Sequence, residues 1–252
     1  MRQQILSCGW LASNEQTVDI EATSIAPACA HLSAGEVPGL HDSVSRQIAG
    51  QTLVDEAYHE LLVLKACLVT RARRGLGTVT VPESQLIVQM RQAQAQCSAS
   101  WQQVLVHLAT AIVSEVLISD DLNVLSTEMT IPPCNRLTVD AHRRDELAHG
   151  SICKGLAQCL DGSLKAHERA FFAEVLPKPV HGLANSELEV WQAMLQHIGF
   201  RATDPVIRDC RHANEENLAR IDYRGVIALA QELGWLEGQR GLDSFAREGL
   251  VR

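Results

Sequence analysis

The sequence carries the motif Asp-Glu-x-x-His twice, at residues 55–59 and 145–149. Each copy lies in a segment whose apolar residues recur every three or four positions, a spacing that predicts an amphipathic helix. Side chains three or four residues apart project from the same face of a helix. The repeat therefore predicts two long helices that each present a glutamate beside a histidine, in a fold that brings the two faces together.

Two such pairs on facing helices, with one further glutamate from each of two other helices, form the ligand set of a di-iron carboxylate site. Glu115 is a candidate because it lies in the apolar stretch 104–118, where an ionised carboxylate is costly to bury unless a cation neutralises it. A core carboxylate paired with Arg or Lys is the alternative for this residue. Glu21 is the second candidate, and Glu15 and Glu36 compete with it from polar or turn surroundings.

His142 precedes Glu146 by one helical turn, so one stripe of that helix carries two imidazoles and a carboxylate. The predicted metal ligands are Glu21, Glu56, His59, Glu115, His142, Glu146 and His149. Four carboxylates balance the charge of two divalent irons, and carboxylates with imidazoles suit iron or manganese better than zinc or calcium. Asp55 and Asp145 are expected to hydrogen-bond histidines from outside the site. His107 is expected to be a satisfied core histidine rather than a ligand.

The composition predicts an all-α fold, because helix-forming residues are abundant and aromatic residues make up only 4% of the chain. A first helix over 16–34 is expected to bend at Pro27, and Thr138 is expected to cap a helix that ends near residue 160. Further helices are predicted over 42–74, 84–96, 104–118, 163–176, 186–199, 205–219 and 223–233, with an extended crossover at 78–82. We expect a single domain over residues 1–252, with the metal-binding bundle at about 15–160 and a helical C-terminal extension at about 163–252.

Charge and hydropathy argue against several partners. The net charge of −8 is spread along the chain without a basic stripe, which argues against nucleic acid. No stretch of eighteen uninterrupted apolar residues suggests a membrane span, and the apolar start is too short for a signal peptide, so a cytoplasmic location is expected. The eight cysteines form no C-x-x-C pair and are expected to be reduced.

The order and spacing of the predicted ligands resemble those of the di-iron N-oxygenases of the p-aminobenzoate N-oxygenase type, over about residues 15–215. An additional histidine one turn before the last Glu-x-x-His is characteristic of that group, and His142 is that residue here. The resemblance implies a ferritin-like bundle, two iron ions, dioxygen (O2) as co-substrate and an external electron donor. It also implies oxidation of a small amine to a hydroxylamine or nitro product.

On this resemblance we expect an N-oxygenase of an arylamine or amino-acid-derived amine, in secondary-metabolite (antibiotic) biosynthesis. The expected partners are the amine substrate and an external reductase, since Gly75-Leu76-Gly77 is too little for a phosphate loop and no flavin or nicotinamide fingerprint is present. A homodimer is the default expectation for this fold. Three alternatives stay open: a di-iron hydroxylase acting at carbon, a non-catalytic iron-binding ferritin-like protein, and a metal-free helical interaction module.

Overall fold

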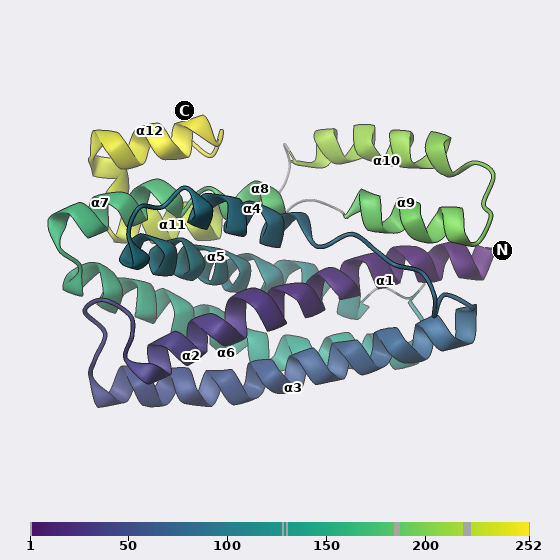
Figure 1. Cartoon of the computed structure of the whole chain (residues 1–252), viewed down its shortest axis with the longest axis horizontal. Helices are drawn as coiled ribbons and strands as arrows, with labels where there is room; N and C mark the ends of the chain where they lie inside the picture. Colours follow the sequence, from purple (N-terminus) through teal and green to yellow (C-terminus); the bar gives the residue numbers. More distant parts are fainter. Residues whose placement is uncertain (1, 128, 130, 184–186, 219–222, 252) are drawn as a thin grey trace.

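A computed structural model describes residues 2–127, 129, 131–183, 187–218 and 223–251, and these residues form helices without any strand. The prediction of an all-α, ferritin-like bundle is confirmed. Four long helical runs lie side by side (Figure 1). They are α1–η1–α2 (Arg2–Ile20, Glu21–Ile25 and Ala26–Ala34), α3 (Ser43–Arg74), α5 (Ser100–Thr127) and α6 (Pro133–Ser163).

The first run is one continuous helix with a π-helical segment, η1, in its middle. Pro27 has no N–H to donate, and the N–H of the preceding Ala26 donates to the carbonyl of Glu21, five residues earlier. A π turn holds one more residue than an α turn, and such segments are frequent at functional sites. A bend was expected at Pro27, and the structure has a π turn directly before it, at Glu21–Ile25.

Helix α3 runs antiparallel to the first run and begins and ends close to the predicted positions. The Asp42 side chain caps it by accepting from the N–H groups of Val44 and Ser45, and three arginines precede Gly75, which has φ +72°. The following residues form no regular element until α4 (Gln85–Ala95), so the predicted crossover at 78–82 is confirmed.

Helix α6 begins earlier than expected, and the predicted cap at Thr138 is wrong. Pro133 takes the first helical position, where a missing N–H costs nothing. Thr138 lies inside the helix, and its hydroxyl donates to the carbonyl of Cys134. Proline was therefore the stronger signal for where this helix starts.

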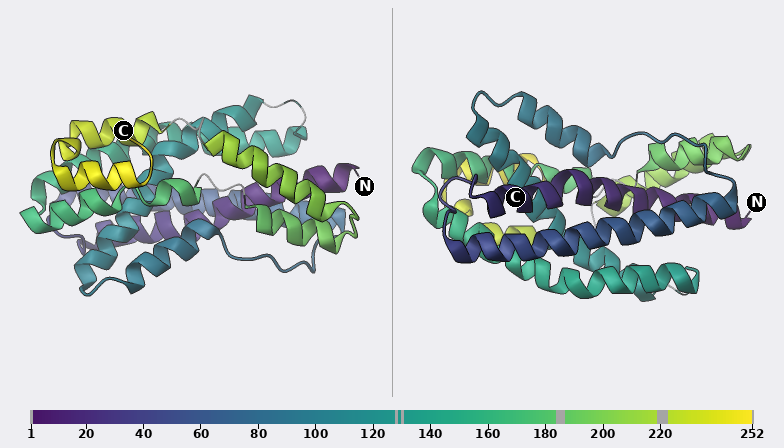
Figure 2. Two further views of the ribbon diagram at one scale, coloured as in Figure 1. Left: turned by 90° about the horizontal axis from the view of Figure 1, so that it is seen from above. Right: turned by 60° about the horizontal axis from the view of Figure 1, so that its bottom comes forward.

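The C-terminal helices form two groups (Figure 2). Helix α9 (Leu188–His197) packs beside the N-terminal half of α1, and α10 (Thr203–Leu218) packs on α9. The remaining elements lie near α5 and are α7 (Ala166–Val175), α8 (Pro179–Leu183), α11 (Arg224–Glu232), η2 (Trp235–Glu237) and α12 (Gln239–Arg247). Residues 186 and 219, where two predicted helices begin or end, lie outside the described residues. Helix α12 and the part of α1 before residue 16 were not predicted from the sequence.

Helix α5 is the core helix of the bundle. Its segment Ser100–Ile118 is long and apolar enough to cross a membrane by length and composition, but 61% of it is buried inside the structure. Leu105, Leu108 and Ile112 belong to the largest hydrophobic cluster, which also takes in side chains of α2, α6 and α7. All eight cysteines are free thiols, as expected.

The turn between α2 and α3 makes one close approach that only glycine permits. Gly39 has φ +79°, and a Cβ there would lie 2.4 Å from Cβ of Ser163 at the end of α6. We expect Gly39→Ala to lower the free energy of unfolding by about 2–4 kcal/mol, because steric overlap adds to backbone strain. Gly75→Ala is the matched control: φ is +72° but nothing lies within 4 Å, so about 1 kcal/mol is expected. Urea titration measures both, and equal losses would contradict this reading.

Candidate metal centre

All seven predicted ligands are brought together in the interior of the bundle, and none is more than 2% exposed. The π turn supplies one carboxylate, α3 a glutamate and a histidine, α5 one glutamate, and α6 two histidines and a glutamate. In chain order these residues are Glu21, Glu56, His59, Glu115, His142, Glu146 and His149. Their convergence follows from the helical stripes on which they lie, since each stripe faces the bundle axis.

Glu146 lies at the middle of the cluster. Its Oε1 is 3.1 Å from Nε2 of His142 and 3.1 Å from Nδ1 of His59. The same oxygen is 3.3 Å from Nδ1 of His149. A carboxylate that reaches three imidazoles from one oxygen is placed to serve two neighbouring cations at once.

The donor atoms form two overlapping groups, in each of which all four atoms lie within 4.8 Å of one another. One group consists of Glu21, His59, His142 and Glu146, and the other of Glu56, His59, Glu146 and His149. The groups share a histidine and a glutamate, so they describe two adjacent positions rather than one. Nε2 of His142 lies 3.2 Å from Glu21, and Nδ1 of His149 lies 2.8 Å from Glu56.

Each aspartate of the repeated motif contacts the histidine of the other motif. Nε2 of His59 lies 3.1 Å from Oδ2 of Asp145, and Nε2 of His149 lies 3.5 Å from Oδ2 of Asp55. These contacts leave Nδ1 of both rings directed at the centre. The expected hydrogen bonds from outside the site are therefore present, and they cross between α3 and α6.

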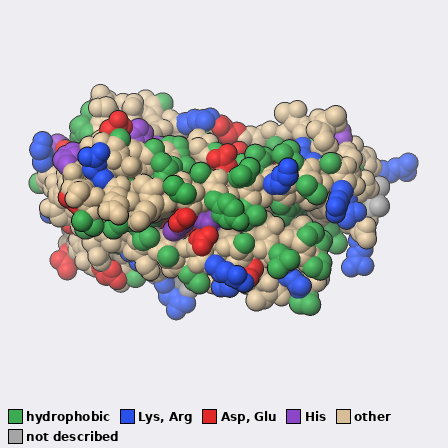
Figure 3. Space-filling view, turned by 90° about the horizontal axis from the view of Figure 1, so that it is seen from below, with side chains coloured by type: hydrophobic (Ala, Val, Ile, Leu, Met, Phe, Trp, Pro, Cys, Tyr) green, Lys and Arg blue, Asp and Glu red, His purple; other side chains and the backbone are tan. Residues whose placement is uncertain are grey.

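Both aspartates lie on the outer face of α3 and α6, with their side chains about half exposed. Figure 3 shows acidic and histidine side chains in the middle of this face, among hydrophobic ones. The hydrophobic side chains exposed on it include Val54, Leu61 and Leu147. On this side, one half-exposed carboxylate lies between solvent and each of the two histidines that these aspartates contact.

Glu115 has no ion pair with Arg or Lys among the described residues, so that interpretation is wrong. Neither of its carboxyl oxygens has a hydrogen-bond donor, and it is completely buried. Burial, with the nearby charges of Glu146 and Glu56, raises the pKa of Glu115 well above its ordinary value. A carboxyl group in this position is stable either when protonated or when bound to a cation.

The rest of the cluster is held together by shared protons when no cation is bound. Burial, reinforced by Glu56, raises the pKa of Glu21. Burial opposes ionisation of Glu56, but hydrogen bonds with Glu21, His149 and His59 lower its pKa to about 2. Burial lowers the pKa of His59 and His149, but hydrogen bonds with Glu146 and Glu56 raise it to about 10 in both. Binding of a cation would therefore release protons from this cluster, because metal ligands must be deprotonated.

The residues fit a pair of iron ions. Buried polar atoms in proteins nearly always have partners, yet no N–H or O–H group of the described residues donates to either carboxyl oxygen of the buried Glu115. The four carboxylates balance the charge of two divalent ions. Carboxylates together with imidazoles match the ligand preference of iron or manganese. Glu21, Glu56, Glu115 and Glu146 with the three histidines would hold the two ions. A ferritin-like bundle with this site defines the class of non-haem di-iron proteins.

Comparison with known proteins agrees with this class and narrows it. The family model described as P-aminobenzoate N-oxygenase AurF matches residues 1–234. The chain is also 28% identical over 236 residues to a 4-aminobenzoate N-oxygenase of Streptomyces thioluteus, an alignment that covers 92% of this chain and 70% of that protein. The chain therefore belongs to the p-aminobenzoate N-oxygenase AurF family. It is an oxidoreductase, a non-haem di-iron oxygenase.

The other candidate residues take structural roles. Glu15 forms an ion pair with Arg71, and Glu36 contacts His31, so neither competitor of Glu21 reaches the centre. His107 donates from Nε2 to the carbonyl of Ser24 in the π segment, at 2.8 Å, which confirms the expected core histidine. This hydrogen bond ties α5 to the turn that carries Glu21.

Proposed function

We propose that this protein is a di-iron, O2-dependent N-oxygenase that oxidises a small amine to a hydroxylamine and further to a nitro product. The observation that carries the proposal is the burial of all seven predicted ligands inside one bundle, including the additional histidine His142 at 3.1 Å from Glu146. The family match and the name of the Streptomyces thioluteus relative support an arylamine as the substrate. Use of the enzyme in secondary-metabolite biosynthesis, a cytoplasmic location and a homodimer remain predictions.

The chemistry supplied by the bound irons is the activation of dioxygen. For the first oxidation the balance is R–NH2 + O2 + 2 e⁻ + 2 H⁺ → R–NHOH + H2O, so a reductase or another external donor must provide the electrons. The chain itself holds the ions through buried carboxylates and orients two imidazoles through Asp55 and Asp145. The surrounding apolar side chains of α5 and α6 exclude water from the reacting groups.

Product analysis separates this proposal from its alternatives. Iron-loaded, reduced protein is exposed to isotopically labelled dioxygen with para-aminobenzoate and with neutral and cationic para-substituted anilines. We expect labelled oxygen on the amine nitrogen, detected by mass spectrometry as hydroxylamine or nitro compound. Label on a ring carbon would favour the carbon hydroxylase, and oxygen uptake without any organic product would favour an iron-storage role. The acidic and imidazole groups of the interior argue against a metal-free module.

Substitution of Asp145, which contacts His59, tests whether these outer aspartates support the metal centre. We expect Asp145→Asn to lower iron affinity or N-oxygenation by about 10–100-fold, because an amide holds the His59 ring less strongly than a carboxylate does. Asp140→Asn is the matched control, since Asp140 lies on the same helix and, within the described part of the chain, forms ion pairs with Arg143 and Arg144 alone. Iron content and turnover of both variants are measured at the same pH. Equal effects of the two substitutions would show that Asp145 has no specific role at the metal centre.

A further inference from the structure

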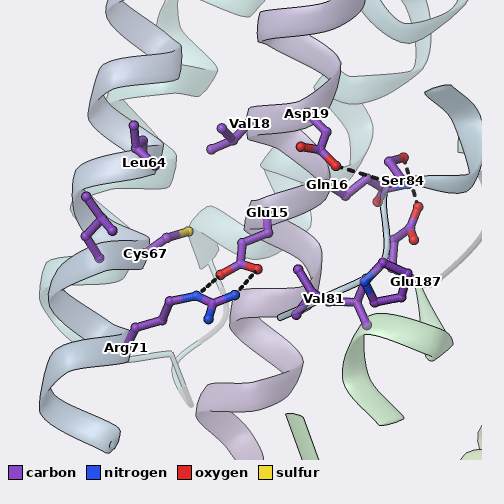
Figure 4. A pocket seen from close by; sticks show the side chains of 13 residues that line it. Glu15, Gln16, Val18, Asp19, Leu64, Cys67, Arg71, Val81, Ser84 and Glu187 are labelled. Carbon is purple, nitrogen blue, oxygen red and sulfur yellow. Dashed lines mark hydrogen bonds and ion pairs between the residues drawn. The ribbon is translucent and has the colours of Figure 1, made fainter. Parts of the chain in front are cut away.

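A pocket of about 240 Å³ lies between α1, α3, the segment 81–84 and the start of α9 (Figure 4). Its walls are largely apolar and include Val18, Leu64, Val81 and Val190. Leu68, at 53% exposure, lies at the surface and marks the outer side of the pocket. A pocket of this size is below the usual range of about 300–1,000 Å³ for drug-sized ligands, so it suits a compound with a single ring.

The pocket and the metal centre share two helices, α1–η1 and α3. Val18 precedes Glu21 by three residues, which is a rise of about 4.5 Å along α1. On α3, the buried stripe that holds Glu56 and His59 continues towards Cys67, which lines the pocket. A molecule that fills the pocket from the surface therefore extends towards the π turn and its carboxylate.

The one arginine in the wall, Arg71, is already neutralised. Its Nε and one terminal nitrogen donate to the two carboxylate oxygens of Glu15. Its other terminal nitrogen donates to the carbonyls of Leu76 and Val79, at 2.9 and 2.8 Å. Four of the five guanidinium N–H groups are thus used within the fold, and Arg71 is poorly placed to receive a substrate carboxylate.

Two further carboxylates in the wall have no such cation. Ser84 lies between them: its N–H donates to Asp19 at 3.1 Å and its hydroxyl donates to Glu187 at 3.0 Å. The N–H of Gln85 also donates to Oε1 of Glu187, while Oε2 has no hydrogen-bond partner. No Lys, Arg or His among the described residues forms an ion pair with either carboxylate.

Glu187 is the more unusual of the two. It is only 1% exposed, and burial raises its pKa. Its backbone has φ +45°, a left-handed conformation that costs a non-glycine residue roughly 1–2 kcal/mol. A buried carboxylate with an unsatisfied oxygen, held on a strained backbone at the wall of a cavity, indicates a missing positively charged partner.

We propose that this pocket binds a cationic group of the substrate, so that the preferred amine carries a second, positively charged substituent rather than a carboxylate. Asp19 and Glu187 receive the cation, and the apolar walls hold the carbon frame beside the π turn. This inference rests on the proposed N-oxygenase function and specifies its substrate class. The proposed substrate differs in charge from 4-aminobenzoate, the anion in the name of the Streptomyces thioluteus relative.

Three para-substituted anilines differ in charge and little in shape, and they test the inference. Their binding to anaerobic, iron-loaded protein is measured by calorimetry: para-aminobenzylamine is cationic, para-aminobenzamide neutral and para-aminobenzoate anionic. We expect the cationic aniline to bind at least about tenfold more tightly than the neutral one, and the anionic one to bind most weakly. Neutral or anionic compounds that bind as tightly as the cation, or no binding at all, would overturn the proposal.

Glu187→Gln keeps the shape of the side chain and removes its charge. We expect it to weaken binding of the cationic aniline at least about tenfold, to raise its KM correspondingly, and to leave the neutral aniline unchanged. Glu83→Gln is the matched control, because Glu83 is exposed and adjacent to Ser84 but does not line the pocket. An equal loss in both variants would reject Glu187 as the cation's partner. Circular dichroism checks folding, and the ligand series on the unmodified protein decides independently if the variant fails to fold.

The same measurements keep the two proposals apart. Selective binding of the cationic aniline without oxidation of any aniline would contradict the N-oxygenase function and leave the pocket assignment standing. Preferred oxidation of para-aminobenzoate, unaffected by Glu187→Gln, would support the function and contradict the pocket assignment.

Discussion

Glu146→Ala should leave the protein without its pair of irons and reduce N-oxygenation by more than about a hundredfold, beyond what the loss of an outer hydrogen bond causes. The reason is the central position of this carboxylate, whose Oε1 lies within 3.3 Å of all three histidines. Both overlapping donor groups contain Glu146, so its removal weakens both metal positions together. Iron analysis after gel filtration and a turnover assay measure the effect.

Glu60→Ala is the control for that experiment. Glu60 follows His59 directly on α3 but is partly exposed and belongs to neither donor group. We expect it to keep its iron and its activity, since surface substitutions usually change stability by no more than about 0.5 kcal/mol. A Glu146→Ala protein that retains two irons per chain would contradict the arrangement of the centre described above.

Glu115→Gln should change stability in opposite directions with and without metal. In the metal-free protein the raised pKa of Glu115 means that folding requires proton uptake above the ordinary pKa of a glutamate. That cost is absent at low pH and grows as the pH rises towards the folded-state pKa. We expect the amide to stabilise the metal-free protein by about 2–4 kcal/mol at about pH 7.5, and the difference to vanish near pH 4.

With iron bound, the order should reverse. The carboxylate then contributes a negative charge and a ligand atom, and tight metal binding stabilises the folded state by mass action. The variant loses part of this gain, so its melting temperature should rise less on addition of iron. Calorimetric melting at several pH values, with and without iron under anaerobic conditions, provides both comparisons. A variant less stable than the original protein in both states would show that Glu115 has a structural partner.

The clustering of the predicted ligands could be predicted from the sequence because helical periodicity fixes which residues share a face. Once Glu56 with His59 and Glu146 with His149 each occupy the buried stripe of a long helix, packing of those stripes brings the groups together. Glu115 was a candidate because a carboxylate in an apolar helix is costly to bury unless it is neutralised or bound to a cation. The sequence around Glu21 was the least distinctive of the seven sites. Its position depends on a π turn, which a helical periodicity does not predict.

The pocket could not be predicted in the same way. Asp19, Ser84 and Glu187 come from three segments that are far apart in the sequence, and only the packed structure places them around one cavity. The start of α6 was misplaced for a different reason. Thr138 is a good cap in isolation, but Pro133 already fixes a helical backbone five residues earlier.

The single π turn in the first helical run has a consequence for how such an enzyme can change. One extra residue rotates everything upstream by about 100° relative to everything downstream. Asp19 and the other pocket residues of α1 lie before this offset, whereas the core residues of α2 lie after it. Substitutions at the pocket positions of α1 can therefore change molecular recognition while the core residues of α2 keep their orientation. Loss of one residue within Glu21–Ile25 would put the two halves out of phase.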